Sequence, residues 1–288
     1  MNIKHVANFV KFHQDGAIWN DFFFTLNTDG TCTVYDLKTV GNDSEKALKQ
    51  LHEFVLDKSE LIVPHSNSVV FGNEFYEPGD EFPILYSNMY NNCAKFEDKH
   101  IGECLAYRIQ KDGDKFTSTL LQIIKIGFTD NDDYWCSPEH DDVRPYGNFV
   151  VDRENSTYWA FTMRDKTHTT RYFSFDMPSV FDGCIDNTYG VKKVTLNIED
   201  IKTFFDCEYH NYIQGACFNS GKVYSVEGFS KKSGKPPALR VIDVNEKKQI
   251  LHVNFEAFDL DTEPEMIDFS GDVCYYSDAH GHMYRIDF

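Results

Sequence analysis

The fold is decided by residues 213–255, which read IQGACFNSGKVYSVEGFSKKSGKPPALRVIDVNEKKQILHVNF. This stretch contains four runs rich in β-branched, aromatic or small apolar residues, at 215–218, 223–226, 241–244 and 249–255. Polar and turn-forming residues separate the runs, which is typical of consecutive β-hairpins. The stretch therefore predicts four antiparallel strands in succession.

The same pattern recurs along the rest of the chain. The third run of four units carries Asp at a matching position, and these residues are Asp36, Asp176, Asp243 and Asp287. First runs precede each hairpin at 16–19, 68–71, 148–151 and 266–269, and further fourth runs are clearest at 120–126 and 191–198. Four-stranded units repeated about every 40 to 70 residues are typical of propeller blades. Five such blades fit the length of 288 residues.

The two ends of the chain support this count. The fifth unit stops at Phe288, directly after its third run, and an apolar run at 6–12 precedes the first unit. We therefore expect an all-β, five-bladed β-propeller, one domain over residues 1–288, whose N-terminal strand completes the last blade. Such closure removes an exposed sheet edge. An ordinary β-sandwich is the alternative, and the only helix candidates are 44–56 and 198–205.

Residues 213–244 and 263–288 look like blades of the five-bladed propellers. That group includes plant-type glutaminyl cyclases and the propeller domains of some phage receptor-binding proteins. The resemblance implies blade architecture over most of the chain. It does not reach any active-site motif of these families, so it implies no particular chemistry.

Composition excludes several classes of partner. Lys and Arg total 28 against 46 Asp and Glu, a net charge of -18, which disfavours binding of a nucleic-acid backbone. The 41% of hydrophobic residues argue against an intrinsically disordered acidic chain. No apolar run approaches the roughly 18 residues of a membrane span. Because the start lacks the features of a secretory signal, we expect a cytoplasmic protein without membrane or nucleic-acid partners.

A site, where one exists, is expected at a mouth of the central channel, because first strands of all blades converge there. In each of the five first runs, we take the residue four positions before the last one. Most of these five residues are polar, and each comes from a different blade. With their neighbours, the residues expected to contact a ligand are Asp15, His65, Asn67, Tyr146, Asn148, Gln214 and Glu265. Solvation of a wet channel is an equally open explanation of these polar residues.

These residues favour a ligand-binding or protein-interaction module that recognises a polar small molecule, a saccharide or a peptide. Tyr146 or Tyr212 would stack on the ligand, and a connection at 128–145 would form a lip over the channel. The alternative is a hydrolase or cyclotransferase that uses Glu265 and Asp15 as acid and base. A scaffold that binds a basic protein through its acidic surface is a third class.

No cofactor is expected from the sequence, and no nucleophile stands out. Oxygen ligands such as Asp15, Asn67 and Glu265 would suit calcium or magnesium better than zinc, although no contiguous calcium loop is present. His280 and His282 could ligate a transition metal, but histidines in a hairpin turn are more often exposed turn residues.

Overall fold

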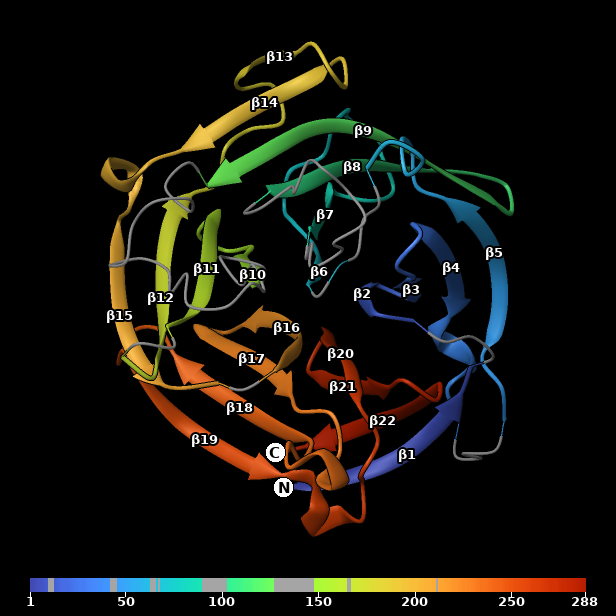
Figure 1. The fold of residues 1–288 in the computed structure, drawn as a ribbon. Coiled ribbons are helices and arrows are strands. Elements are labelled where there is room, and N and C mark those ends of the chain that lie inside the picture. The colour runs from blue at the N-terminus through green and yellow to red at the C-terminus, as the bar shows by residue number, and fades with distance from the viewer. Residues whose placement is uncertain are drawn as a thin grey trace.

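In a computed structural model of the chain, five β-sheets stand in a ring around a central axis (Figure 1). The structure describes residues 1–9, 13–41, 46–62, 66, 68–89, 103–126, 148–164, 167–210 and 212–288. Helical structure in these ranges is limited to four short 3-10 turns, η1 (Leu37–Thr39), η2 (Ile198–Asp200), η3 (Lys231–Ser233) and η4 (Phe255–Phe258). No helix in these ranges is long and apolar enough to span a bilayer. The five-bladed β-propeller predicted from the repeats is confirmed.

Each blade is an antiparallel sheet whose strands follow one another from the axis outward. Blade one consists of β2 (Asp15–Trp19), β3 (Phe22–Leu26), β4 (Thr31–Asp36) and β5 (Lys49–Val55). Blade two contains β6 (Val69–Phe71), β7 (Leu85–Asn88), β8 (Glu103–Asp112) and β9 (Lys115–Ile126), and blade three contains β10 (Asn148–Asp152), β11 (Thr157–Arg164), β12 (Thr169–Asp176) and β15 (Thr203–Glu208). Blade four consists of β16 (Ile213–Asn219), β17 (Lys222–Glu227), β18 (Ala238–Asp243) and β19 (Lys248–Asn254).

Blade five closes the ring with strands from both ends of the chain. It contains β20 (Pro264–Ser270), β21 (Val273–Asp278), β22 (His282–Asp287) and, as its outermost strand, β1 (Asn2–Asn8). The β1 strand pairs antiparallel with β22, so the two termini lie side by side in Figure 1. This confirms the predicted closure by the N-terminal segment, with the strand beginning at Asn2 rather than at residue 6.

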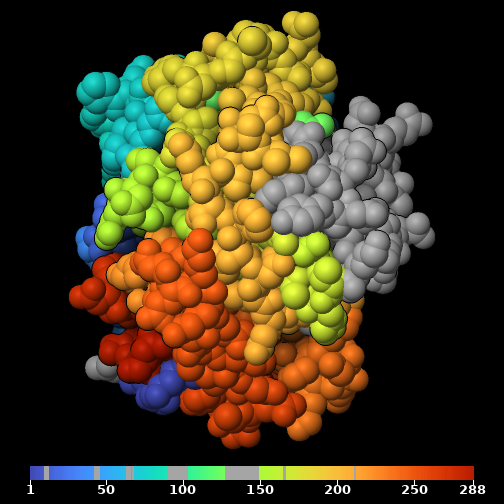
Figure 2. All heavy atoms as spheres, turned by 90° about the vertical axis from the view of Figure 1, so that its left-hand side faces the viewer, coloured from blue at the N-terminus to red at the C-terminus, as the bar shows by residue number. Residues whose placement is uncertain are grey.

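Blade two is extended by two strands that come from a later part of the chain. After β12 the chain forms β13 (Cys184–Asp186) and β14 (Val191–Leu196), and β14 pairs parallel with β9. The chain then returns to blade three as β15. In Figure 2 this yellow segment lies at the top of the molecule, above the orange strands of blade four. The extension covers the outer edge of blade two, which would otherwise expose unpaired backbone groups.

The core is divided into five clusters, one between each pair of neighbouring blades. Inner-strand residues alternate between the two interfaces: in β2, Ala17 packs against blade two and Ile18 packs against blade five. Successive side chains of a strand point to opposite faces, so each inner strand supplies two clusters. Buried Phe and Tyr residues fill the spaces between the blades, which accounts for much of the aromatic content.

Three sequence predictions of local structure are wrong. Residues 191–198 do not form the fourth strand of blade three, because β14 joins blade two and β15 takes that place. The helix candidate 44–56 is occupied mainly by β5, and the candidate 198–205 begins with the 3-10 turn η2 but then runs into β15. Both strands have a half-exposed alternating pattern, and their pairing with the third strand of a blade overrides local helix propensity.

Candidate functional site

The inner strands β2, β6, β10, β16 and β20 surround the axis, and three of the predicted site residues lie where these strands begin. Asp15 opens β2, Gln214 is the second residue of β16, and Glu265 is the second residue of β20. With Glu263, which precedes β20, these three residues define what we call the acidic mouth. Asn148 opens β10, but its side chain is outside the described part of the structure. Also outside it are His65, Asn67, Tyr146 and the connection 128–145.

Gln214 and Glu265 each occupy a β-bulge. In blade four the register shifts between Ile213 and Gly215, so Gln214 has no partner on β17. In blade five the register shifts between Pro264 and Met266, which leaves Glu265 without a partner on β21. A bulge redirects its extra side chain and is frequent next to functional sites. The two bulges lie at equivalent places on neighbouring blades.

Gly215 allows the two bulges to approach closely. A Cβ atom on Gly215 would lie 2.6 Å from the backbone oxygen of Glu265, which is well inside van der Waals contact. The side chain of Gln214 then reaches the same blade, because its Nε2 donates to Oε1 of Glu263 at 2.6 Å. Gln214 Nε2 also lies 3.3 Å from the carbonyl oxygen of Gly228. Blades four and five are thus linked at the acidic mouth by backbone contact and by side chains.

The carboxyl groups of this mouth bind protons more tightly than free carboxyl groups do. Burial raises the pKa of Glu263 to about 7, and the hydrogen bond from Gln214 acts in the opposite direction. Burial raises the pKa of Glu265 well above its usual value, and the nearby charges of Glu263, Asp15 and Asp278 raise it further. Oε1 of Glu265 is buried and has no hydrogen-bond partner among the described residues. Such an atom carries a desolvation cost unless a ligand or water satisfies it.

Asp15 has a bracing role that the sequence did not indicate. Its Oδ1 accepts from its neighbour Gly16 N and its Oδ2 from Val69 N, both at 2.7 Å, so β2 is bonded to β6 of the next blade. Burial raises the pKa of Asp15, and these two N–H donors lower it. Asp268 does the same between blades five and one, since its Oδ2 accepts from Ile18 N at 2.7 Å. Both carboxyls are committed to holding inner strands together.

Two further polar groups lie near Glu265. His13 is fully buried, its Nε2 is 2.8 Å from the hydroxyl of Ser277, and burial lowers its pKa to about 3, so the ring is neutral. Asp278, which ends β21, accepts from the backbone N–H groups of His280 and His282 and from Nδ1 of His282 at 2.8 Å. These histidines are therefore engaged with Asp278 in the turn. Within the described ranges, no group of three or more His, Cys, Asp or Glu is placed to hold a metal ion.

Arg153 marks the opposite end of the inner strands, and the sequence prediction missed it. It follows β10, its Nε donates to the carbonyl oxygen of Phe71 at 2.7 Å, and its guanidinium lies 5.4 Å from the centre of the Trp19 ring. A cavity of about 430 Å³ is lined there by Arg153, Trp19, Phe269 and the turns after β2 and β20. We call this end, defined by Trp19, Arg153 and Phe269, the aromatic mouth. The only sequence signal was the aromatic ending of four first runs.

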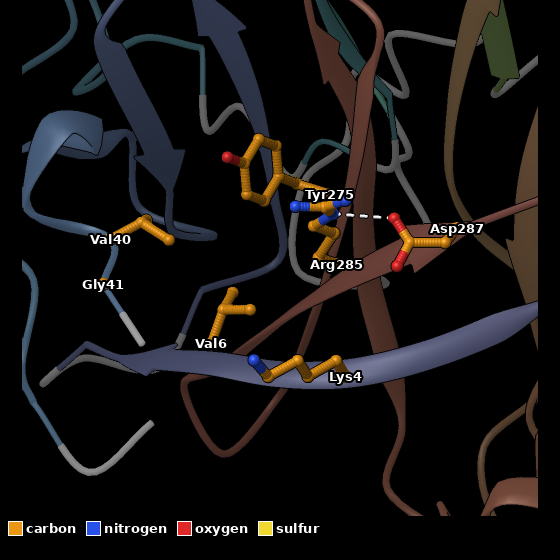
Figure 3. A pocket seen from close by; sticks show the side chains of 7 residues that line it. All are labelled: Lys4, Val6, Val40, Gly41, Tyr275, Arg285 and Asp287. Carbon is orange, nitrogen blue, oxygen red and sulfur yellow. Dashed lines mark hydrogen bonds and ion pairs between the residues drawn. The ribbon is translucent and has the colours of Figure 1, made fainter. Parts of the chain in front are cut away.

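A second cavity, of about 500 Å³, lies away from the axis between blades five and one (Figure 3). The wall of this cavity has polar groups from Lys4, Tyr275, Arg285 and Asp287 and apolar groups from Val6 and Val40. Arg285 is already paired, because its Nε donates to Oδ1 of Asp287 at 2.7 Å, as the dashed line in Figure 3 marks. The arginine of this cavity is thus already paired with a carboxylate, and we compare it below with Arg153 at the aromatic mouth.

The sequence matches no protein-family model and no curated protein. Among solved structures, the glutaminyl cyclase of Myxococcus xanthus is 9% identical, with a TM-score of 0.49 over 100% of this chain and 94% of that one. Saccharomyces cerevisiae Sqt1 is 9% identical, with a TM-score of 0.38 over 92% and 55% of the two chains. The computationally designed Ika8 protein is 10% identical, with a TM-score of 0.36 over 99% and 100%. These likenesses assign no activity, and the propeller architecture rests on the strand pairing of the chain itself.

Proposed function

We propose that this propeller is a binding module that recognises a polar ligand, a saccharide or a peptide, at the acidic mouth. Gln214, Glu263 and Glu265 make the contacts, with Tyr212 beside them on the strand entry of blade four. The observation that carries the proposal is the buried Oε1 of Glu265, which has no hydrogen-bond partner within the described ranges and belongs to one of two bulges at equivalent places on neighbouring blades. His65, Asn67, Tyr146 and Asn148 remain sequence-based predictions for the same site.

The chemistry of the mouth favours a ligand with hydroxyl or amide groups. Burial raises the pKa of Glu265 and so favours its protonated form, which can both donate and accept a hydrogen bond. Glu263, with a pKa of about 7, changes from donor to acceptor within the neutral range. Mixed donors and acceptors suit saccharides and peptides, which present both kinds of group. A ligand bound through the Glu263 carboxylate should therefore bind more tightly as the pH rises from 6 to 8.

The proposal is tested with a panel of saccharides and short peptides, screened by ligand-induced thermal shift and followed by calorimetry. The double variant Gln214→Ala/Glu263→Gln should weaken any ligand at least about tenfold, the equivalent of about 1.4 kcal/mol for a lost charge-assisted hydrogen bond. Glu246→Gln is the matched control, because this carboxylate is exposed on blade four and pairs with the exposed Lys248. Ligands whose affinity is the same in the double variant and the wild type would contradict the assignment.

A hydrolase or cyclotransferase is the second candidate, and one observation favours it. Glu263 and Glu265 are two neighbouring carboxyls with differently raised pKa values, and such pairs divide into acid and base. Asp15 is a poorer partner for Glu265 than the sequence suggested, because both of its oxygens accept from backbone N–H groups. This candidate predicts turnover with a bell-shaped pH profile whose alkaline limb disappears in Glu265→Gln. Binding without turnover for every ligand of the panel would exclude it.

A further inference from the structure

Arg153 is held at the aromatic mouth by contacts that leave the outer edge of its guanidinium unused. The Nε atom donates to the carbonyl oxygen of Phe71, and Nδ2 of Asn73 donates to the carbonyl oxygen of Arg153 at 2.8 Å. The guanidinium lies over the ring of Trp19. Neither Nη1 nor Nη2 of Arg153 donates to a residue in the described part of the chain. An arginine from blade three is therefore anchored on blades two and one, with two donors left for a ligand.

The surroundings of Arg153 form a small recess that is open to solvent. The cavity of about 430 Å³ falls within the range of small-molecule pockets, which is about 300–1,000 Å³. Trp19 and Phe269 supply apolar walls, and Asn20, in the turn after β2, and Ser270, the last residue of β20, supply polar edges. The hydroxyl of Ser270 bonds to the carbonyl oxygen of Asn20 at 3.1 Å, which joins the turn after β2 to the end of β20 at the border of the recess.

The charges near Arg153 determine what kind of anion fits. Asp21 lines the cavity and is paired with Lys38 at 2.7 Å. The buried carboxyl of Asp268 lies close enough for Arg153 to lower its pKa, which burial raises. Because Lys38 compensates Asp21, the guanidinium of Arg153 has the buried Asp268 carboxyl as its neighbouring acid, and this local balance leaves no excess positive charge for a dianion such as phosphate. A carboxylate carries one charge, and its planar pair of oxygens matches the paired Nη donors of arginine.

We propose that the aromatic mouth is a second ligand site, in which Nη1 and Nη2 of Arg153 bind the carboxylate of a small organic acid while Trp19 and Phe269 contact its apolar part. The site is independent of the acidic mouth and lies at the other end of the inner strands. Its ligand is a monoanionic carboxylate small enough for the 430 Å³ cavity.

The test uses benzoate as the probe and benzamide as its neutral isostere. Binding is followed by calorimetry and by the indole N–H signal of Trp19 in NMR spectra, which the variant Trp19→Phe assigns. Benzoate should bind with a Kd on the order of 1–10 mM and shift the Trp19 signal, as expected for one ion pair with ring contacts. Benzamide should shift the signal at least about tenfold less at equal concentration, because it lacks the charge.

Two variants test whether benzoate binds to the planar guanidinium of Arg153. Arg153→Gln should weaken benzoate binding at least about tenfold, and Arg153→Lys, which keeps the charge and loses the planar fork, should lie between it and the wild type. Arg285→Gln, in the cavity of Figure 3, is the matched control and should leave the affinity unchanged. Equal benzoate affinity in Arg153→Gln and the wild type would overturn the proposal.

If Arg153→Gln does not fold, measurements on the wild-type protein still test whether the aromatic mouth binds a carboxylate. Benzoate and benzamide shifts of equal size, or no shift of Trp19 with benzoate, would contradict a carboxylate site. Inorganic phosphate is the third probe, and it should bind at least about tenfold more weakly than benzoate, because the Asp268 carboxyl repels a dianion more strongly than a monoanion. Phosphate binding tighter than benzoate binding would overturn the assignment to carboxylates.

Discussion

At the acidic mouth β16 and β20 are interrupted by bulges, whereas at the aromatic mouth the same strands pair regularly as far as Asn219 and Ser270. Gln214 and Phe218 are four residues apart on one strand, and so are Glu265 and Phe269 on the next. At about 3.3 Å per residue, roughly 13 Å of strand separates a polar end from an aromatic one. The two ends of the same strands therefore carry opposite chemistry.

The difference shows how regular and irregular strands place side chains. Where the ladder is regular, alternate residues enter the packed interfaces between blades, and Phe218 and Phe269 pack against two of these clusters. Where the ladder is bulged, Gln214 and Glu265 leave this pattern. The charged group at the regular end comes from outside these strands, because Arg153 lies in the turn after β10. The predictions below test this contrast.

The largest effect is expected from Asp15→Ala, which removes the brace between blades one and two at the acidic end. The N–H groups of Val69 and Gly16 would lose their buried acceptor, and the free energy of unfolding should fall by about 3 kcal/mol. Urea unfolding measures this loss. Asp112→Ala, at an exposed strand end, is the control and should change stability by less than about 0.5 kcal/mol. A loss below about 1 kcal/mol for Asp15→Ala would contradict the bracing role.

Gly215→Ala should break the contact between the two bulges. The new Cβ would lie 2.6 Å from the backbone oxygen of Glu265, so the strands must separate, at a cost of about 2 kcal/mol. Asn219→Ala, at the regular end of the same strand, should cost less than about 0.5 kcal/mol. Chemical denaturation of both variants compares the two ends directly. Equal stability of the two variants would show that the bulged end tolerates separation.

The acidic mouth should also make stability depend on pH. Because the pKa of Glu263 is raised from 4.5 to about 7 on folding, the unfolded chain loses this proton first as the pH rises. The free energy of unfolding should therefore fall between pH 4.5 and 7, by on the order of 1 kcal/mol after allowance for solvent screening of this half-buried group. Unfolding curves of Glu263→Gln across this range should have a shallower slope than those of the wild type. Identical slopes would contradict the raised pKa.

The smallest change in stability is expected at the aromatic mouth. Arg153→Gln loses the hydrogen bond to the carbonyl of Phe71 and the contact with Trp19, together worth about 1 kcal/mol at a solvent-accessible site. Thermal unfolding of Arg153→Gln and of the control Arg285→Gln measures this loss. The free energy of unfolding of the control should lie within about 0.5 kcal/mol of the wild type. A loss above about 3 kcal/mol would indicate that Arg153 is mainly structural, against a role in ligand binding.

Much of the architecture was predictable because blades repeat a local pattern. The Asp at the end of third strands is an example: Oδ1 of Asp243 accepts from the backbone N–H groups of Asn245 and Glu246, both at 3.0 Å, and Asp36 does the same for Lys38 at 3.1 Å. These hydrogen bonds join residues two or three positions apart, so the Asp recurs at a recognisable position in the sequence. The parallel pairing of β14 with β9 joins distant segments and has no such signal in the sequence.

The candidate site was predicted in part for the same reason. Alignment of first strands located Gln214 and Glu265, because inner strands of a propeller begin at one end of the axis. The bulges, the approach at Gly215 and the bond from Gln214 to Glu263 depend on how neighbouring blades meet. Arg153 was missed because its partners Phe71 and Trp19 belong to other blades.

The sequence by itself determined the number of blades, the closure of the ring by its termini, and the strand ends where polar residues gather. These follow from hydrophobic alternation and turn chemistry, which act over a few residues. Only the tertiary structure decided that Asp15 is a brace, that Glu265 Oε1 has no partner among the described residues, and that both Nη nitrogens of Arg153 lie beside a cavity with no described acceptor. Burial, pKa and pairing depend on atoms brought together from different blades, so no local pattern encodes them.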